Sequence, residues 1–384
     1  MKLIDVCDFQ GGSQPPKEEW SFENQEGYIR MLQIRDFTQR KRVQPEYIKI
    51  SNTTKICEAD DILIARYGAS IGKILTGLAG AYNVAIMRTI PDTEKIQKKY
   101  LYYYLKSAYF QNMIANVGAR AAQAGFNRED LAKLEIECPS MVEQDNIVKI
   151  LSKIENTIDK RKAEIRLLDE LIRARFVEMF GDPVANNFGW RQERLKGVTS
   201  KIGSGATPRG GKESYQAEGI TLIRSMNVHD GRFEYKDLAH ITDNQAAQLD
   251  NATVEKGDVF INITGASVAR SCIVPDNTLP ARVNQHVAII RCVHSKLLPV
   301  FANNMFLNSN FKDQLLSIGE SGGATRQAIT KQQLENLTVI LPPLKLQEQF
   351  SAFVTEVNKS KVAVQKSLDE TQLLFDSLMQ KYFG

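Results

Sequence analysis

The sequence predicts an α+β protein built from two tandem repeats, each a globular α+β domain followed by one long helix. Three observations predict this fold. One sequence block occurs twice, a heptad pattern of apolar residues follows each copy, and short β-like runs fill most of the remaining chain. We expect the twin helices to pack as an antiparallel coiled coil, with the two domains related by a pseudo-two-fold axis.

The repeat is clearest where each domain ends. The pattern L-x-x-L-x-[IV]-x-x-P-x-x-x-x-Q spans Leu131–Gln144 and returns at Leu334–Gln347, an offset of 203 residues. The same offset places Phe180-Gly181 on Phe383-Gly384. A duplication of this length implies two similar units with similar tasks, and therefore a partner that offers two similar sites.

Earlier parts of the repeat also match, with small slips. Val84–Arg88 pairs with Val287–Arg291 at an offset of 203, and Asp61–Ile64 pairs with Asp258–Ile261 at 197. The segments between these blocks diverge, and insertions collect in surface loops. Two repeats that share a core but differ in their loops are expected to bind two different ligands in the same manner. Neutral drift of the loops is the alternative.

The pattern gives four segments. The first domain is predicted at residues 1–143, a central long helix at 144–181, the second domain at 182–346 and a C-terminal long helix at 347–384. Runs such as Ile62–Ala65 and Val259–Asn262 predict strands, and a helical stretch over Lys99–Val117 interrupts them.

Apolar residues in the long helices recur at alternating spacings of three and four, which predicts a packed helical seam. The first helix contributes Ile147, Leu151, Ile154, Ile158, Ile165, Leu168 and Ile172, and the second contributes Phe350, Val354, Val357, Val364, Leu368, Phe375 and Leu378. Roughly 36 residues at 1.5 Å each form a rod of about 54 Å. Such a rod can hold two DNA-reading domains one turn of the double helix apart, roughly 34–36 Å. The alternative is a hairpin that only joins the domains.

Composition allows nucleic-acid binding without requiring it. The chain has 384 residues, a net charge of +4 and a pI near 8.6. No apolar run approaches a membrane span and the start does not resemble a signal peptide, so a cytoplasmic protein without membrane contact is expected. The cysteines Cys7, Cys57, Cys138, Cys272 and Cys292 are scattered, which favours reduced thiols and no metal site.

These features together resemble the specificity subunit of type I restriction-modification systems, over nearly the whole chain. The resemblance rests on the duplicated L-x-x-L-x-[IV]-x-x-P-x-x-x-x-Q block that enters a long helix, and on helices ending in Met179–Gly181 and Tyr382–Gly384. Gly189-Trp190 and the loop Gly203–Pro208 open the second domain in the manner of this family, whereas the first domain begins without a counterpart of Trp190.

The resemblance implies that each globular unit is a target-recognition domain reading one half of a bipartite double-stranded DNA target. The paired helices would set the spacer and hold two methyltransferase subunits, which bind S-adenosylmethionine and methylate adenine. Nuclease-translocase subunits would join for restriction, and this chain would hold no cofactor or metal of its own. A specificity subunit of a methylation-only or type IIB-like system is the alternative within the same class.

The residues favour a chain without catalysis. The Pro-Pro pairs Pro15-Pro16 and Pro342-Pro343 lack the Asn or Asp and the aromatic residue that hold a flipped base in adenine methyltransferases. The segment Gly205–Glu213 has one residue too many for a phosphate-binding loop and has Glu213 where Ser or Thr must ligate magnesium. A self-sufficient nuclease or methyltransferase and a coiled-coil adaptor that binds only proteins remain competing hypotheses.

Base reading requires Arg or Lys for guanine and Asn or Gln for adenine, and phosphate contacts add Ser, Thr and backbone amides. Candidates lie in the loops between the repeated blocks. In the first domain they are Arg30, Gln33, Arg35, Arg66, Tyr67, Lys73, Arg120, Gln123 and Asn127; in the second they are Lys201, Ser204, Thr207, Arg209, Lys212, Arg224, Asn227, Asn262, Thr264, Arg270, Arg326, Gln327 and Thr330.

Overall fold

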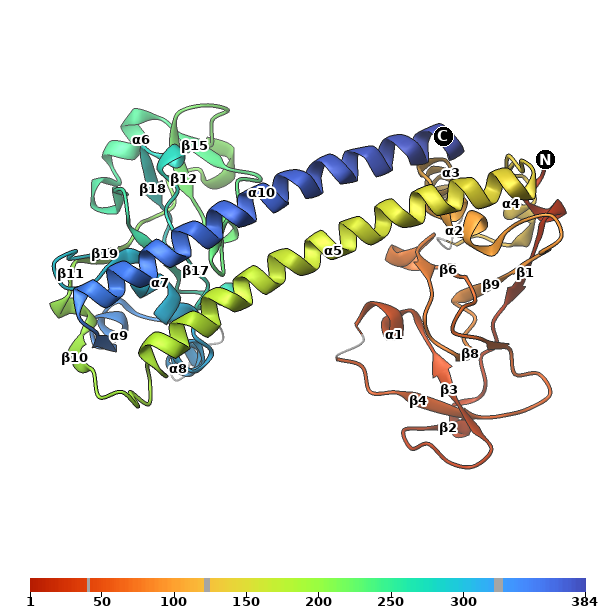
Figure 1. The fold of residues 1–384 in the computed structure, drawn as a ribbon, viewed down its shortest axis with the longest axis horizontal. Helices are drawn as coiled ribbons and strands as arrows, with labels where there is room; N and C mark the ends of the chain where they lie inside the picture. Colours follow the sequence, from red (N-terminus) through yellow and green to blue (C-terminus); the bar gives the residue numbers. More distant parts are fainter. Residues whose placement is uncertain (40–41, 121–124, 321–326) are drawn as a thin grey trace. The chain divides into compact units, whose positions relative to one another are not determined.

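The computed structural model describes residues 1–39, 42–120, 125–320 and 327–384 (Figure 1). It divides into two compact units. Unit 1 contains Met1–Lys162 and Lys366–Gly384, and unit 2 contains Ala163–Gln365. The two long helices, α5 (Met141–Phe180) and α10 (Leu344–Phe383), therefore each contribute one part to either unit.

Unit 1 contains two small sheets and a group of helices. One sheet has the order β1-β9-β6-β7, and the other has the order β2-β4-β3-β8-β5. The strands are β1 (Cys7–Gly11), β2 (Trp20–Ser21), β3 (Tyr28–Leu32), β4 (Glu46–Lys49), β5 (Ile56–Cys57), β6 (Leu63–Ala65), β7 (Ile74–Leu75), β8 (Gly80–Tyr82) and β9 (Ile86–Pro91). The helices before α5 are α1 (Ile34–Thr38), α2 (Lys98–Lys106), α3 (Ala108–Arg120) and α4 (Arg128–Leu131).

Unit 2 repeats the first of these sheets with the order β11-β19-β16-β17 and adds the sheets β15-β12-β18, β10-β20 and β13-β14. Its strands are β10 (Arg191–Arg194), β11 (Thr199–Ser204), β12 (Ile220–Ile223), β13 (Val228–His229), β14 (Arg232–Phe233), β15 (Ala239–Ile241), β16 (Val259–Asn262), β17 (Ser271–Ile273), β18 (Ala281–Val283), β19 (Val287–Cys292) and β20 (Thr338–Leu341). Its helices before α10 are α6 (Asp243–Ala247), α7 (Pro299–Leu307), α8 (Ser309–Glu320) and α9 (Lys331–Glu335).

The two units share their topology as well as their sequence blocks. Each contains one parallel strand pair, β3 with β8 in unit 1 and β12 with β18 in unit 2. The α+β class and the duplication are therefore confirmed. The helical stretch expected over Lys99–Val117 is two helices, because the chain turns at Ser107, whose ψ of 154° is extended.

Sheet register corrects one offset. Leu63 lies opposite Arg88 in unit 1, and Phe260 lies opposite Ile289 in unit 2. Strands β9 and β19 thus correspond at an offset of 289 − 88 = 201 residues, whereas the sequence match gave an offset of 203. Because side chains alternate along a strand, a shift of two residues keeps every side chain on its own face.

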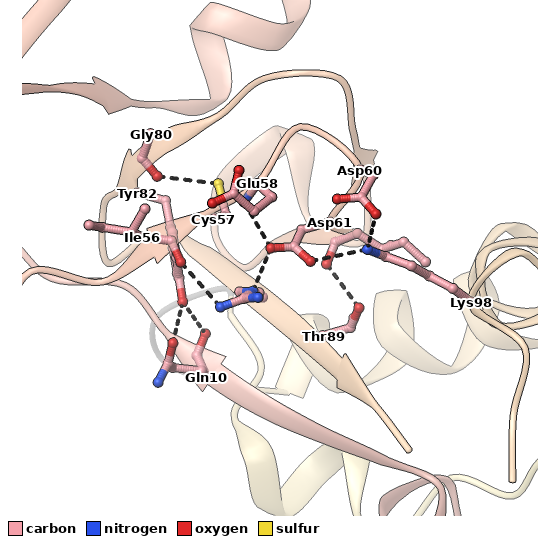
Figure 2. A network of polar contacts seen from close by, with 12 residues as sticks. Gln10, Ile56, Cys57, Glu58, Asp60, Asp61, Gly80, Tyr82, Thr89 and Lys98 are labelled. Atoms are coloured by element: carbon pink, nitrogen blue, oxygen red, sulfur yellow. Dashed lines mark hydrogen bonds and ion pairs between the residues drawn. The ribbon is translucent and has the colours of Figure 1, made fainter. Parts of the chain in front are cut away.

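A buried ion pair joins the equivalent strands in both units. In unit 1, Arg88 Nε lies 2.7 Å from Asp61 Oδ2, and Lys98 Nζ lies 3.2 Å from Asp61 Oδ1. Figure 2 shows Asp61 beside Lys98, with the hydroxyl of Tyr82 directed to Gln10. In unit 2, Arg291 makes a bidentate pair with the fully buried Asp258, at 2.8 and 2.9 Å.

The long helices complete the core of each unit. In unit 2, Phe176 and Phe180 of α5 pack against Phe350 of α10 and Phe301 of α7, with ring centroids 4.8–5.5 Å apart. In unit 1, Leu151 of α5 belongs to the same apolar cluster as Phe375, Leu378, Met379 and Phe383 of α10. All fourteen seam residues expected from the heptad pattern are buried or half-buried.

Polar residues that interrupt the heptad pattern also contact the other helix. Arg161 donates to the Ser367 carbonyl within unit 1, and Lys361 forms an ion pair with Asp169 within unit 2. The interruptions therefore add cross-helix polar contacts to the apolar seam.

Four of the five cysteines are buried and Cys138 is half-buried, and all five are free thiols. Burial raises the pKa of Cys7, Cys272 and Cys292 to about 12, so these thiols stay protonated at neutral pH. None of the helices in the described part combines the length and apolar character needed to cross a bilayer.

Candidate nucleic-acid interface

In unit 1 the loop after β6 meets the segment that precedes α4. Tyr67 forms an isolated β-bridge with Gly125, and an added Cβ on Gly125 would lie 2.4 Å from the Tyr67 ring. Gly125 is thus required for the close approach of these two segments. The Tyr67 ring stays partly exposed at 38%.

The guanidinium of Arg66 is held at this junction by main-chain oxygens. Its Nε donates to the Phe126 carbonyl and its Nη1 to the Val84 carbonyl, both at 3.3 Å, and the group lies 5.0 Å from the centroid of the Tyr67 ring. No carboxylate among the described residues pairs with it. The positive charge is therefore fixed in place without being neutralised, which suits a phosphate or a guanine edge.

A second cation of this loop has a counterpart in the other unit. Lys73 and Arg270 lie 197 residues apart and occupy the same place, because the backbone N–H of Ala65 bonds to the Lys73 carbonyl and that of Asn262 to the Arg270 carbonyl, both at 2.9 Å. Neither side chain forms an ion pair with an acidic residue in the described part of the chain. Two unpaired cations at equivalent loop positions fit phosphate contacts.

In unit 2 a chain of polar side chains crosses the corresponding surface. Thr207 donates to Gln285 Oε1, Gln285 Nε2 lies 3.2 Å from His286 Nε2, and His286 Nδ1 shares a hydrogen bond of 2.5 Å with the Thr264 hydroxyl. Thr264 bridges Ala328 as Tyr67 bridges Gly125. The two units thus share a scaffold but present different chemistry, basic and aromatic in one and amide and imidazole in the other.

Gln285 and His286 were not among the residues expected from the sequence. They follow β18 and directly precede the repeated Val287–Arg291 block, and a pair of base-reading side chains at the edge of a repeated block is the signal that could have found them.

Several of the residues predicted to contact DNA form bonds with neighbouring carboxylates. Arg30 pairs with the buried Asp36 at 2.8 Å, and Gln33 and Arg35 both bond to the Glu46 carboxylate. All three groups are tied to carboxylates, which partly neutralise the charges of Arg30 and Arg35. They can reach DNA only by exchanging those partners.

Asn127 and Thr330 have a structural role at equivalent places. Each is the N-cap of a short helix, where its side-chain oxygen accepts a hydrogen bond from the backbone of Asp130 or Gln333. Lys201 donates to the Thr253 carbonyl at 3.1 Å, and burial together with the nearby Arg291 holds the pKa of Lys201 below its ordinary value.

Asn227 and Asn262, which the sequence predicts to contact DNA, are both fully buried. Asn227 Nδ2 donates to the carbonyls of Glu234 and Lys236 at 3.0 and 3.3 Å, and its Oδ1 accepts from the Arg224 N–H. Asn262 Nδ2 donates to the Ser225 carbonyl at 2.9 Å. Both amides stabilise loops of unit 2 instead.

The remaining expected residues differ in accessibility. Arg209 is exposed and Ser204 is half-buried. Arg224 donates to the Asp237 carbonyl and lies over Tyr215, and Gln327 donates to Glu320 at 2.8 Å. Gln123 and Arg326 lie outside the described residues, as do the side chains of Arg120 and Lys212.

Comparison with known proteins shows which family has this sequence pattern. The family model described as the type I restriction modification DNA specificity domain matches residues 1–168 and 187–371, one match per repeat. The chain is similar to two Methanocaldococcus jannaschii proteins. It is 24% identical to the putative type I restriction enzyme MjaX specificity subunit, over 69% of this chain and 62% of that protein. It is 24% identical to the MjaIX specificity subunit, over 99% of this chain and 91% of that protein.

Solved structures agree on the fold. A type I restriction-modification S subunit from M. genitalium covers the whole chain and 95% of its own length with a TM-score of 0.55, at 15% identity. A chain from a study of assembly of the type I R-M system gives 0.52 at 20% identity, over 100% of this chain and 96% of its own. With two family matches that together span most of its length, the chain belongs to the type I restriction modification DNA specificity family.

Proposed function

We propose that this chain is the non-catalytic DNA specificity subunit of a type I restriction-modification complex. Each repeat reads one half of a bipartite double-stranded target. The observation that carries this proposal is the pair of equivalent loop surfaces, built on one scaffold but bearing different side chains. A scaffold of this kind binds two different half-sites in the same manner.

The target-recognition domains are assigned to residues 1–143 and 182–346, and the spacer helices to 144–181 and 347–384. In this proposal α5 and α10 pair along their length as an antiparallel coiled coil with pseudo-two-fold symmetry. The apolar seam within each unit and the cross-helix contacts of Arg161 and Lys361 support it. Helices of 40 residues extend about 60 Å, enough to separate two half-sites by a fixed spacer.

The catalytic work belongs to partners. Two methyltransferase subunits dock on the paired helices, bind S-adenosylmethionine and methylate adenine, and nuclease-translocase subunits join for restriction. The described residues contain no cluster of His, Cys, Asp and Glu able to hold a metal ion. A specificity subunit of a related methylation-only or type IIB-like system is the alternative function. The complex works on DNA in the cytoplasm.

A methylome tests the proposal. The chain is expressed with its neighbouring methyltransferase in a host without other adenine methylation, and modified adenines are mapped by long-read sequencing. The expected result is a split motif of two short elements around a fixed gap, with one methylated adenine on each strand. If no motif is found although the methyltransferase binds both S-adenosylmethionine and this chain, the specificity role is rejected in favour of a protein adaptor.

A further inference from the structure

The turn between β18 and β19 holds Gln285 at the surface of unit 2. Gln285 is exposed, whereas Asn284 before it is buried. The Asn284 N–H bonds to the Ile223 carbonyl at the end of β12, at 3.0 Å. Its side-chain oxygen accepts a hydrogen bond from the His286 N–H, also at 3.0 Å. The backbone on both sides of Gln285 is therefore fixed by hydrogen bonds.

Both polar atoms of the Gln285 amide have a partner within unit 2. The Thr207 hydroxyl donates to Oε1 at 2.5 Å, and Nε2 lies 3.2 Å from His286 Nε2. Because an amide nitrogen can only donate, His286 Nε2 accepts, and the proton of the neutral imidazole is on Nδ1. Nδ1 then donates to the Thr264 hydroxyl, 2.5 Å away. Together these bonds determine which way the Gln285 amide faces.

One donor and one acceptor of this amide stay free. An amide oxygen can accept two hydrogen bonds and an amide NH₂ group can donate two. One lone pair of Gln285 Oε1 and one hydrogen of Nε2 thus have no partner among the described residues, and the side chain is exposed. In the major groove, adenine offers the N6 donor and the N7 acceptor, whereas guanine offers two acceptors. The free pair on Gln285 therefore matches adenine.

The equivalent turn of unit 1 carries a different side chain. The Asn83 N–H bonds to the carbonyl at the end of β3, and Asn83 Oδ1 accepts from the Ala85 N–H, both at 3.2 Å. These are the contacts that Asn284 makes in unit 2. Val84 thus takes the place of Gln285, and its apolar side chain is 40% exposed. A shared turn that presents an amide in one unit and an isopropyl group in the other fits a position that distinguishes two half-sites.

We propose that Gln285 reads an adenine in the major groove of the half-site of unit 2, and that Thr207 and His286 are positioning residues for its amide. Oε1 accepts from adenine N6, and Nε2 donates to adenine N7. This inference rests on the proposed function, because it assigns one base within the half-site that unit 2 reads. The two remain separable, because a complex can recognise a split target without this contact.

The test uses the chain assembled with its methyltransferase, and duplexes that carry the mapped split target. Each adenine of the half-sites is replaced in turn by 7-deazaadenine, which lacks the N7 acceptor but keeps its base pairing. One of these duplexes is expected to bind the unaltered complex about tenfold more weakly than the unmodified target. The complex with Gln285→Val, which introduces the residue of unit 1, is expected to bind both duplexes equally.

Three further variants separate base reading from other roles. Gln285→Glu keeps the size of the side chain but can only accept, so the preference at that position should shift from adenine towards cytosine, whose N4 donates. Thr207→Val removes the hydroxyl that holds Oε1 and should reduce the selectivity for adenine at the same position alone. Gln248→Val, a change of an exposed glutamine directly after α6, is the control and should leave every position unchanged.

A loss with 7-deazaadenine that persists in Gln285→Val would overturn the proposal, because another residue would then read that adenine. So would unchanged base preferences in Gln285→Val, binding that is weakened evenly across all sequences, or a target in which none of the adenines depends on N7. A split motif without these effects rejects this inference alone. Absence of any split motif rejects the proposed function and this inference with it.

Discussion

Gln144 and Gln347 make the same three contacts in the two repeats. Both side chains are fully buried. Oε1 accepts from the backbone N–H of Gln97 in unit 1 and of Leu298 in unit 2, at 2.8 and 2.9 Å. Nε2 donates to the carbonyls of Lys95 and Pro139 in unit 1, both at 2.9 Å. The repeated glutamine thus joins the start of each long helix to the loop before α2 or α7.

Replacing Gln347 by Leu should destabilise unit 2. The change leaves the Leu298 N–H and the Lys296 and Pro342 carbonyls without their partner, and each buried unsatisfied group costs about 1–3 kcal/mol. Chemical denaturation measures the loss. Gln332→Leu is the control, because that side chain is exposed on α9. Equal stability of the two variants would contradict the assigned role.

Asn227→Ala should lower stability and leave the recognised bases unchanged. The substitution removes hydrogen bonds to the Glu234 carbonyl and the Arg224 N–H, at a cost of about 1–3 kcal/mol. Thermal unfolding and the methylome are measured together, with the exposed Asn244→Ala as control. A changed base in the motif would show that Asn227 leaves its buried site to contact DNA.

Arg66→Ala should relax recognition at one base of one half-site, because the guanidinium is fixed by carbonyls and has no carboxylate partner. A bidentate guanine contact contributes about 1–3 kcal/mol of discrimination, and Arg66→Lys should not restore it. Methylation at targets changed one base at a time measures the effect. Arg128→Ala, an exposed cation paired with Asp8, is the control. A uniform loss across all sequences would instead identify a phosphate contact.

Lys73→Ala and Arg270→Ala should weaken DNA binding evenly across sequences. Each removes one unpaired cation from the equivalent loops, and each lost phosphate contact should reduce the slope of log affinity against log salt by about 0.9. Binding of the assembled complex to its target at several salt concentrations gives this slope. A slope unchanged by both substitutions would remove these residues from the interface.

Asp61→Asn should lower the stability of unit 1 at neutral pH and make it less sensitive to acid. Burial alone would raise the pKa of Asp61, but hydrogen bonds from the Glu58 N–H and Lys98, together with the charge of Arg88, lower it. A lowered pKa stabilises the fold above the unfolded value of about 3.9, and this contribution is lost as the pH falls through the folded pKa.

Melting temperatures at neutral pH and at about pH 3 compare Asp61→Asn with Asp60→Asn, since the Asp60 side chain is 81% exposed. The difference between Asp61→Asn and the unaltered chain is expected to narrow at acid pH. A constant difference at both pH values would contradict the assigned charge interaction.

The sequence predicted the features that depend on periodicity and repetition. The duplicated block, the α+β class and the burial of the helical seam all follow from spacing, which local sequence determines. Spacing alone does not separate structural from binding roles among the loop residues. Asn227 and Arg66 both lie in loops between repeated blocks, yet one is buried and the other carries an uncompensated charge. Loop residues of one type can stabilise a turn or bind a ligand, and only tertiary contacts separate the two roles.

Capping shows the same limit. Asn127 and Thr330 were expected to contact DNA, but each caps a helix of only four or five residues. Asparagine and threonine are favoured both at caps and at phosphate contacts. His286 and Gln285 are recognised as candidate site residues only from the fold, which brings them beside Thr264 and Thr207.

The central claim is that each domain reads its own half-site, and a domain replacement tests it most directly. Residues 1–143 are replaced by a copy of 182–346, and the methylome of the replaced chain with its methyltransferase is compared with that of the original. The account predicts a symmetrical split motif in which the second half-site appears on both strands and the first is lost. Retention of the first half-site by an active complex that lacks residues 1–143 would contradict it.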